Sequence, residues 1–186
     1  EHHHADLGDV QLHYVTIGNG EPVVLLHGWP QSWYAWRCIM AELAKTYRVI
    51  APDLRGLGDS SRPLEGYDKK TIAHDMWRLL HDHLGLNEFS LVGHDWGGPV
   101  AYALAAAHPD AVRKLAVLDV TIPGDNPGAG AGNFSQGGKR WHHAFHQTVD
   151  MPEALIAGRE HIYFTWFYRN WGHRADVLPD EVIAEY

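Results

Sequence analysis

The first 120 residues alternate between strand-like and helix-like hydrophobic patterns. Residues 10–17 alternate apolar and polar side chains, as in a half-exposed strand, whereas 23–26 form an unbroken apolar run that is typical of a buried strand. Similar runs predict three more strands, at 47–51, 89–92 and 114–120. Helical spacing of apolar residues predicts three helices, at 35–45, 69–84 and 98–107. This alternation predicts an α/β fold with a mostly parallel sheet flanked by helices.

The pattern changes after Ile122. Residues 123–138 contain six glycines within the stretch GDNPGAGAGNFSQGG, which predicts a linker or hinge rather than another strand. Residues 139–186 carry helical patterns that are dense in aromatic side chains and show no convincing strand. We therefore expect the N-terminal part of a core domain at 1–122, a hinge at 123–138 and an incomplete helical cap at 139–186.

Composition narrows the class of protein. With 186 residues and 45% apolar content, the chain is expected to form one globular domain with an inserted cap. The formal net charge of −8, without a basic stretch, argues against nucleic acid and anionic membranes as partners. Cys38 is the only cysteine, which excludes an internal disulfide and fits a reducing compartment, so we expect a cytoplasmic protein. A homodimer is compatible with the sequence.

The fifteen histidines raise the question of a metal site. The run His2–His4 is compatible with native sequence or with a purification tag, and it is left out of the mechanism. The pairs His81/His83 and His142/His146 have no carboxylate or cysteine pattern that completes a metal site. We expect surface histidines, no metal and no cofactor.

The segment Gly93-His94-Asp95-Trp96-Gly97 follows a predicted strand and precedes a helix of small residues. This is the context of a nucleophile elbow, in which glycines permit a sharp turn that exposes the central side chain. Asp95 stands in the central position, and a carboxylate is already anionic at neutral pH, so it can attack carbon without a base. The alternative is an aspartate that merely caps the helix.

A second motif, HGWP at 27–30, follows the predicted strand at 23–26. A loop there can aim the backbone N–H of Trp29 at the same point as the N–H of Trp96, which would give two donors for an oxyanion. A plain strand-to-helix turn also explains HGWP by itself.

Three segments in order, HGWPQSWYAW, PDLRGLGDS and GHDWGG, resemble the epoxide hydrolases of the α/β-hydrolase fold and their dehalogenase relatives, and the resemblance spans residues 10–186. It implies that Asp95 opens an epoxide or displaces a halide to form an enzyme ester, which a histidine-activated water then hydrolyses. It also implies that Trp29 and Trp96 are oxyanion donors, with His27 in the oxyanion loop. We expect the loop at 53–60 to be structural.

The resemblance suggests three further site residues. Asp119, at the end of a predicted strand, would orient the catalytic histidine, although other members carry this acid on a later strand and a loop cap is the simpler alternative. In the cap, His142, with His143 as second choice, would give a proton to the substrate's leaving oxygen, where many members use tyrosine. A pair of surface histidines is the alternative reading.

In the family order, the catalytic histidine follows the cap. We find no good substitute for it between residues 1 and 186, and therefore expect the chain to form the ester without hydrolysing it. Epoxide hydrolysis is our first hypothesis, with a small apolar epoxide as substrate. Haloalkane or haloacid dehalogenation is the rival hypothesis. Against it, dehalogenases usually have asparagine or glutamate at the position where this chain has Trp29. Fluoroacetate dehalogenases have arginines at the positions where this chain has Trp96 and Pro99. A catalytically silent binding module is a third hypothesis.

Overall fold

The computed structural model describes residues 1–120, 141–172, 174 and 178–186. Contacts divide the chain into two units, one formed by Glu1–Ile122 with Tyr186 and the other by Pro123–Glu185. The predicted hinge at 123–138 lies outside the described residues.

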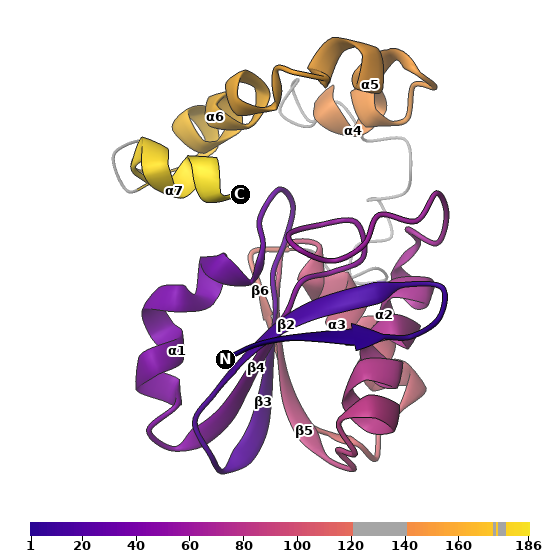
Figure 1. Cartoon of the computed structure of the whole chain (residues 1–186), viewed down its shortest axis with the longest axis vertical. Coiled ribbons are helices and arrows are strands. Elements are labelled where there is room, and N and C mark those ends of the chain that lie inside the picture. The colour runs from indigo at the N-terminus through magenta and orange to yellow at the C-terminus, as the bar shows by residue number, and fades with distance from the viewer. Residues whose placement is uncertain (121–140, 173, 175–177) are drawn as a thin grey trace. The chain divides into compact units, whose positions relative to one another are not determined.

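The first unit is built on a six-stranded sheet with the order β1-β2-β4-β3-β5-β6 (Figure 1). Its strands are β1 (His2–Asp6), β2 (Gln11–Ile17), β3 (Glu21–Leu26), β4 (Tyr47–Pro52), β5 (Phe89–His94) and β6 (Val112–Leu118). β4, β3, β5 and β6 run parallel, whereas β2 is antiparallel to both β4 and β1. The mostly parallel sheet predicted from the sequence is therefore confirmed, although β6 begins and ends two residues before the predicted range.

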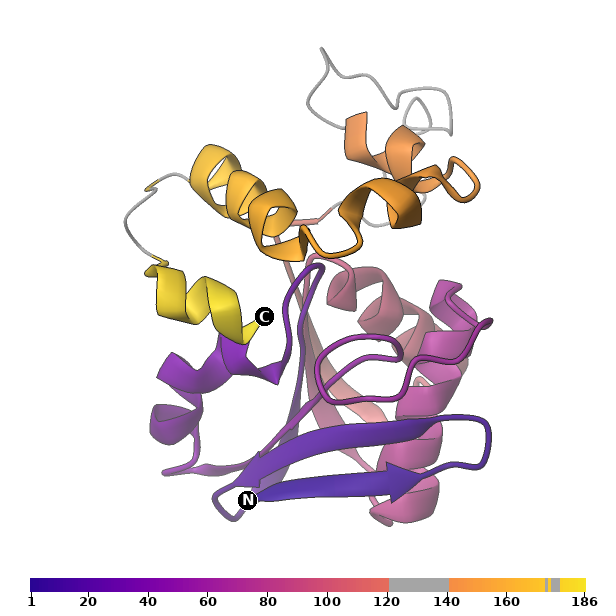
Figure 2. The same cartoon turned by 45° about the horizontal axis from the view of Figure 1, so that its top comes forward.

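β1 is a strand that the sequence pattern did not predict. It pairs with β2 in the register His3↔Tyr14 and forms an edge of the sheet, visible as an indigo hairpin in Figure 2. The imidazole of His3 contacts the Thr16 hydroxyl at 3.0 Å, and His2 Nδ1 lies 2.9 Å from His13 Nε2. A polar, histidine-rich run carries no strand-like alternation, so only its pairing with β2 reveals it.

Helices cover both faces of this sheet. α1 (Arg37–Leu43), which follows a 3-10 turn at Trp33–Trp36, lies on one face, whereas α2 (Lys69–Trp77) and α3 (Gly97–Ala107) lie on the other (Figure 1). α2 continues into a π-helical segment, η2 (Arg78–His83), so the predicted helix at 69–84 is present but changes its winding. The three-layer arrangement explains why the central strands are apolar on both sides.

Alternate residues of β3 pack into two hydrophobic cores, one on each face of the sheet. Val24 and Leu26 belong to the core under α2 and α3, whereas Val23 and Leu25 belong to the core under α1. Successive side chains of a strand point to opposite faces, so one unbroken apolar run fills both layers. At the sheet's edge, β6 leaves Leu115 and Leu118 exposed by 38% and 43%.

The second unit consists of helices in its described part. These are α4 (Trp141–His146), α5 (Met151–Ile156), α6 (Glu160–Trp171) and α7 (Asp180–Glu185), and no strand occurs among the residues described there. Phe167 of α6 is buried, and its ring stacks on Trp141 at 5.7 Å and contacts the edge or face of Tyr163 and Trp171. The aromatic density seen in the sequence therefore supplies this unit with a small core of its own.

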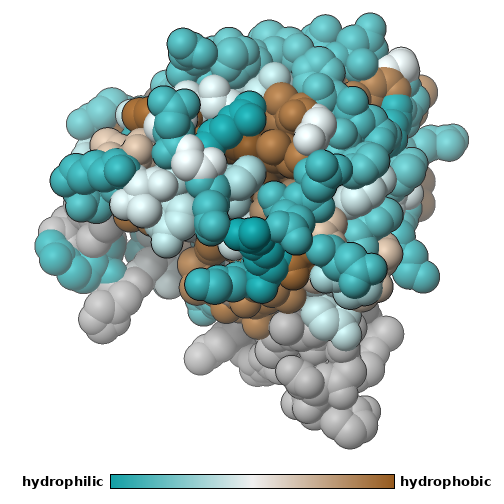
Figure 3. All heavy atoms as spheres, turned by 90° about the horizontal axis from the view of Figure 1, so that it is seen from below, coloured by the Kyte–Doolittle hydropathy of each residue, from teal (hydrophilic) through white to brown (hydrophobic). Residues whose placement is uncertain are grey.

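Figure 3 shows a face that is mostly hydrophilic, with hydrophobic residues grouped in a few small areas, as suits a chain with a formal charge of −8. No helix in the described ranges has the length and apolar character needed to cross a membrane.

Candidate active site

Asp95 occupies the turn between β5 and α3. Its φ is +49°, a left-handed conformation that few residues other than glycine, asparagine and aspartate adopt. Asp95 N–H donates to the Leu118 carbonyl at 3.1 Å, and the Asp95 carbonyl accepts from Gly98 N–H at 2.9 Å. These two bonds hold the chain in the sharp bend that a nucleophile elbow requires.

Glycines make the bend sterically feasible. A Cβ at Gly97 would lie 2.3 Å from the Leu26 carbonyl oxygen, so only glycine lets α3 start this close to β3. A Cβ at Gly28 would lie 2.4 Å from Asp95 Cβ and 2.5 Å from Asp95 Oδ1. The HGWP loop and the elbow are therefore in direct contact, although 66 positions separate Trp29 from Asp95.

The contact includes a hydrogen bond to the carboxylate. Trp29 N–H donates to Asp95 Oδ1 over 2.8 Å. The N–H of Trp96 has no acceptor in the part of the chain that the structure describes, so it is available for a second bond. With one carboxylate oxygen held by a backbone amide, the other oxygen could attack an electrophile, and the amide could stabilise negative charge on the oxygen that it holds.

His27 supports this loop from beneath. It is fully buried, its Nδ1 donates to the Gly28 carbonyl at 3.0 Å, and its Nε2 accepts from Leu54 N–H at 3.1 Å. Burial lowers the pKa of His27, which favours the neutral ring that this bonding pattern needs. Since both nitrogens are occupied by backbone groups, His27 fixes the shape of the oxyanion loop and has no free nitrogen for a substrate.

The loop at 53–60 is organised around the buried carboxylate of Asp53. Asp53 accepts from Trp33 N–H at 2.7 Å, from Asp59 N–H at 3.0 Å and from His13 Nδ1 at 2.7 Å. Burial acts to raise the pKa of Asp53, but the hydrogen bonds outweigh it and hold this pKa below its usual value. These contacts give the loop the structural role that its sequence predicts.

His13, Asp53 and Asp59 are also the group in the described residues whose ligand atoms lie close enough, within 4.8 Å of one another, to hold a metal ion. Both oxygens of Asp53 already accept hydrogen bonds, and His13 Nδ1 is one of the donors. A cation would have to displace these bonds, so the arrangement suits a structural network better than a metal site.

Asp119 follows β6 directly. Leu118, its neighbour, carries the carbonyl that accepts from Asp95 N–H, and His94 pairs with Leu118 in the sheet. The side chain of Asp119 is exposed, and its φ is +52°. The structure therefore brings Asp119 to the same edge of the sheet as Asp95.

The two histidines that the sequence suggests as proton donors lie on α4 in the second unit. His142 is buried there, with ring contacts to Phe167 at 5.3 Å and Trp171 at 4.7 Å. His143 is half-buried, with its ring 4.3 Å from that of His142. His142 is thus part of the aromatic core of its unit rather than one of a pair of surface histidines.

Sequence reasoning missed Lys69, the first residue of α2. Its ammonium nitrogen lies 3.1 Å from the centroid of the Trp96 ring, beside the candidate nucleophile. The lysine and the tryptophan are far apart in the chain, and a lysine at the start of a helix carries no signal of such a contact.

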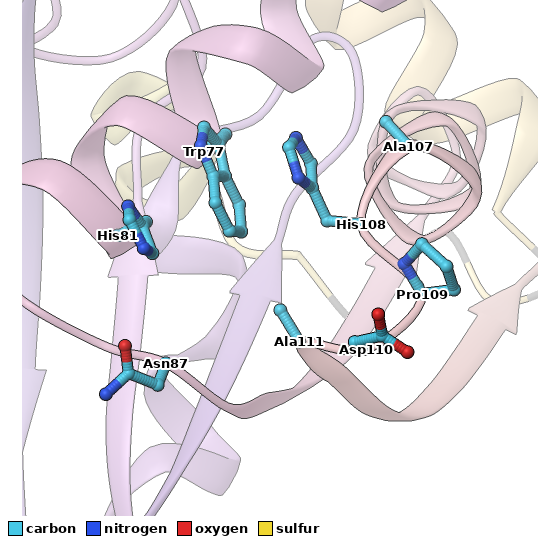
Figure 4. A pocket seen from close by; sticks show the side chains of 8 residues that line it. All are labelled: Trp77, His81, Asn87, Ala107, His108, Pro109, Asp110 and Ala111. Atoms are coloured by element: carbon cyan, nitrogen blue, oxygen red, sulfur yellow. The ribbon is translucent and has the colours of Figure 1, made fainter.

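A separate hollow of about 300 Å³ lies at the opposite ends of β5 and β6, lined by Trp77, His81, Asn87, Ala107, His108, Pro109, Asp110 and Ala111 (Figure 4). His108 lies flat on Trp77 with ring centroids 3.5 Å apart, and His81 stacks on the same indole at 4.3 Å. Asp95 follows the other end of β5, so this hollow is distinct from the elbow.

Comparison with known proteins shows the family to which the fold belongs. The family described as alpha/beta hydrolase fold matches residues 21–155, which include both the HGWP loop and Asp95. The chain belongs to this family. As an α/β-hydrolase it is 43% identical, over 188 residues, to the soluble epoxide hydrolase of Corynebacterium sp. (strain C12), a match that covers 100% of this chain and 65% of that protein.

Other relatives of this α/β-hydrolase include a dehalogenase. The fluoroacetate dehalogenase of Burkholderia sp. is 36% identical, over 97% of this chain and 61% of its own length. Among solved structures, Cfl2 from Burkholderia cenocepacia has a TM-score of 0.89 at 43% identity, with 100% of this chain and 64% of that chain covered. The epoxide hydrolase CorEH has a TM-score of 0.87 at 41% identity, with 100% and 66% covered. The chain thus spans less than two thirds of the length of these relatives.

Proposed function

We propose that this α/β-hydrolase opens epoxides through a covalent ester on Asp95. The observation that carries the proposal is the hydrogen bond of 2.8 Å from Trp29 N–H to Asp95 Oδ1, which orients an anionic carboxylate at a bend where its second oxygen is free. The similarity to a soluble epoxide hydrolase over the whole chain supports the same reaction.

The first step follows from this geometry. Oδ2 of Asp95 attacks a ring carbon, the carbon–oxygen bond of the epoxide breaks, and its electron pair stays on the epoxide oxygen as an alkoxide. The product of this step is a hydroxyalkyl ester after the alkoxide takes up a proton. The N–H groups of Trp29 and Trp96 hold Oδ1, which becomes the carbonyl oxygen of the ester.

His142 is our candidate for the proton donor, with His143 second, because an imidazole N–H can protonate an alkoxide at neutral pH. Asp119 is our candidate for the acid that orients a catalytic histidine in the second step, in which water cleaves the ester. Among the described residues no histidine is hydrogen-bonded to Asp95, and both nitrogens of His27 are engaged. We therefore expect the ester to accumulate in this chain rather than turn over.

Intact-mass spectrometry with styrene oxide tests the proposal. The protein should gain the mass of one styrene oxide molecule, and peptide mapping should place the adduct on Asp95. Asp95→Asn, which keeps shape and hydrogen bonding but lacks the anionic nucleophile, should gain none. Equal labelling of Asp95→Asn would contradict the proposal. Many diol molecules per protein without an adduct would contradict only the expected accumulation of the ester.

Dehalogenation is the second candidate, because a fluoroacetate dehalogenase is among the relatives. Attack by Asp95 on a haloalkane would break the carbon–halogen bond, and the halide would leave with the electron pair and need no proton. His142→Phe should therefore slow adduct formation with an epoxide much more than with a bromoalkane. Bromide release without any epoxide adduct would favour the dehalogenase, and neither reaction would favour a binding module.

A further inference from the structure

Lys69 is held beside the elbow by the start of α2. The carboxylate of Asp68 caps this helix, since its Oδ1 accepts from Lys70 N–H and Thr71 N–H, each at 3.0 Å. The Lys69 ammonium then lies 3.1 Å from the centroid of the Trp96 ring, a cation–π contact with the residue that follows Asp95. The Asp68 N-cap of α2 and the Trp96 ring together determine where the Lys69 ammonium lies.

The ammonium is buried but has no hydrogen-bond acceptor among the described residues. Burial lowers the pKa of Lys69 to about 8, while the charges of Asp95 and Asp68 act in the opposite direction. Lys69 is thus mostly cationic at neutral pH, and the face of one indole cannot satisfy its three N–H donors. Desolvating a charge in this way is costly unless an anion accompanies it.

Arg55 is a buried cation with a structural role, and it differs from Lys69 in being paired with carboxylates. Arg55 Nε and Nη2 donate to the two oxygens of Asp75 at 2.7 and 2.8 Å, and Nη2 also reaches Asp9 at 2.8 Å. Among the described residues no carboxylate accepts from the Lys69 ammonium, which lies instead over the ring of Trp96, the residue after Asp95. A ligand that brings its own negative charge would supply the missing acceptor.

We propose that Lys69 binds a carboxylate of the substrate, so that the site prefers small epoxides with an acid group beside the ring. This inference rests on the proposed function and departs from the apolar substrate expected from the sequence. An acidic epoxide approaching Asp95 brings two negative charges together, and the buried cation of Lys69 offsets their repulsion. Its free N–H donors give the acid group a fixed orientation.

Glycidate and glycidamide form a matched pair for the test, because they differ in a carboxylate against an amide on the same oxirane. The wild type should form the Asp95 adduct faster with glycidate, and this preference should fade as the pH rises through about 8, where Lys69 loses its proton. Lys69→Met should lower the glycidate-to-glycidamide rate ratio about tenfold or more, as expected for one lost charge-assisted hydrogen bond. Lys69→Arg should retain most of the ratio.

Lys70→Met is the control, since Lys70 is an exposed lysine on the same helix and should leave the ratio unchanged. An equal rate for both reagents in the wild type, or a ratio that Lys69→Met leaves intact, would overturn the proposal. The absence of any adduct with either reagent would count against the proposed function instead.

A second measurement does not depend on covalent adduct formation. In Asp95→Asn, the Lys69 side-chain resonance, assigned by its loss in Lys69→Arg, should move on addition of propionate and not of propionamide. A shift with propionate supports carboxylate binding even if no epoxide reacts. No shift with either compound would refute it.

Discussion

The backbone amide of Trp29 and the carboxylate of Asp95 are joined by a hydrogen bond of 2.8 Å between the HGWP loop and the nucleophile elbow. Two segments that are far apart in the chain thereby form one site. The bond orients the Asp95 carboxylate before any substrate arrives, as the proposed attack by a fixed nucleophile requires.

Gly28→Ala should disable this site without unfolding the chain. The added methyl would lie 2.4 Å from Asp95 Cβ, so the carboxylate or the loop must move. A displacement of this kind can cost about a hundredfold in rate. Adduct formation with styrene oxide should fall accordingly. Gly85→Ala is the control, because it is strained by a positive φ but has open space around its Cβ and does not touch Asp95. Equal rates in the two variants would contradict the prediction.

Removing the charge of Asp75 should destabilise the first unit. Asp75 and Arg55 are almost fully buried, and Asp75→Asn would leave the guanidinium with only partial compensation from Asp9. Loss of one partner of a buried ion pair costs about 3 kcal/mol or more of unfolding free energy. Urea unfolding followed by circular dichroism measures this change.

Glu88→Gln provides the comparison for that variant. Glu88 pairs with Arg113 at the surface, where both side chains are about half exposed. Exposed pairs contribute about 0–1 kcal/mol, so this variant should unfold close to the wild type. If Asp75→Asn cost no more than Glu88→Gln, the buried pair would not have the role described.

The stack of His108 on Trp77 predicts a pH dependence of stability. Burial, and then the neighbouring His81 and His74, lower the pKa of His108 in the folded protein. The unfolded chain therefore binds the proton more readily, and stability is lost as the pH falls below about 6.5. His108→Phe keeps an aromatic ring on the indole but does not titrate. Between about pH 7.5 and about pH 5.5, the wild type should lose more unfolding free energy than this variant. Equal losses would show that protonation of His108 does not cause the pH dependence.

Phe167 should be the main support of the second unit. It is 4% exposed and contacts the rings of Trp141, Tyr163 and Trp171. Phe167→Ala should cost about 3–5 kcal/mol in that unit, seen as a loss of near-ultraviolet circular dichroism and as faster proteolysis of α6. Ile162→Ala, at a side chain that is 70% exposed on the same helix, should change neither signal. A proteolysis rate for Phe167→Ala that matches Ile162→Ala would argue against a separate aromatic core.

Local patterns predicted most of the first unit correctly. The apolar run at 23–26 identified β3 because a strand buried on both faces needs apolar side chains at every position, and the glycines around Asp95 identified the elbow because of close backbone approach. Features that depend on residues distant in the sequence were not predicted. β1 exists through its pairing with β2, and the placement of Lys69 depends on Trp96. The roles of His27 as a loop support and of His142 as a core residue likewise emerge only from their neighbours.

The left-handed conformation at Asp95 also limits which amino acids evolution or a protein engineer can place there. Asparagine and aspartate tolerate this region of backbone space, whereas a branched side chain such as threonine or valine would strain the main chain before any reaction is considered. Attempts to install a new reactive group at this position must therefore satisfy a conformational requirement first. Backbone conformation and reactivity thus place separate requirements on the same amino acid.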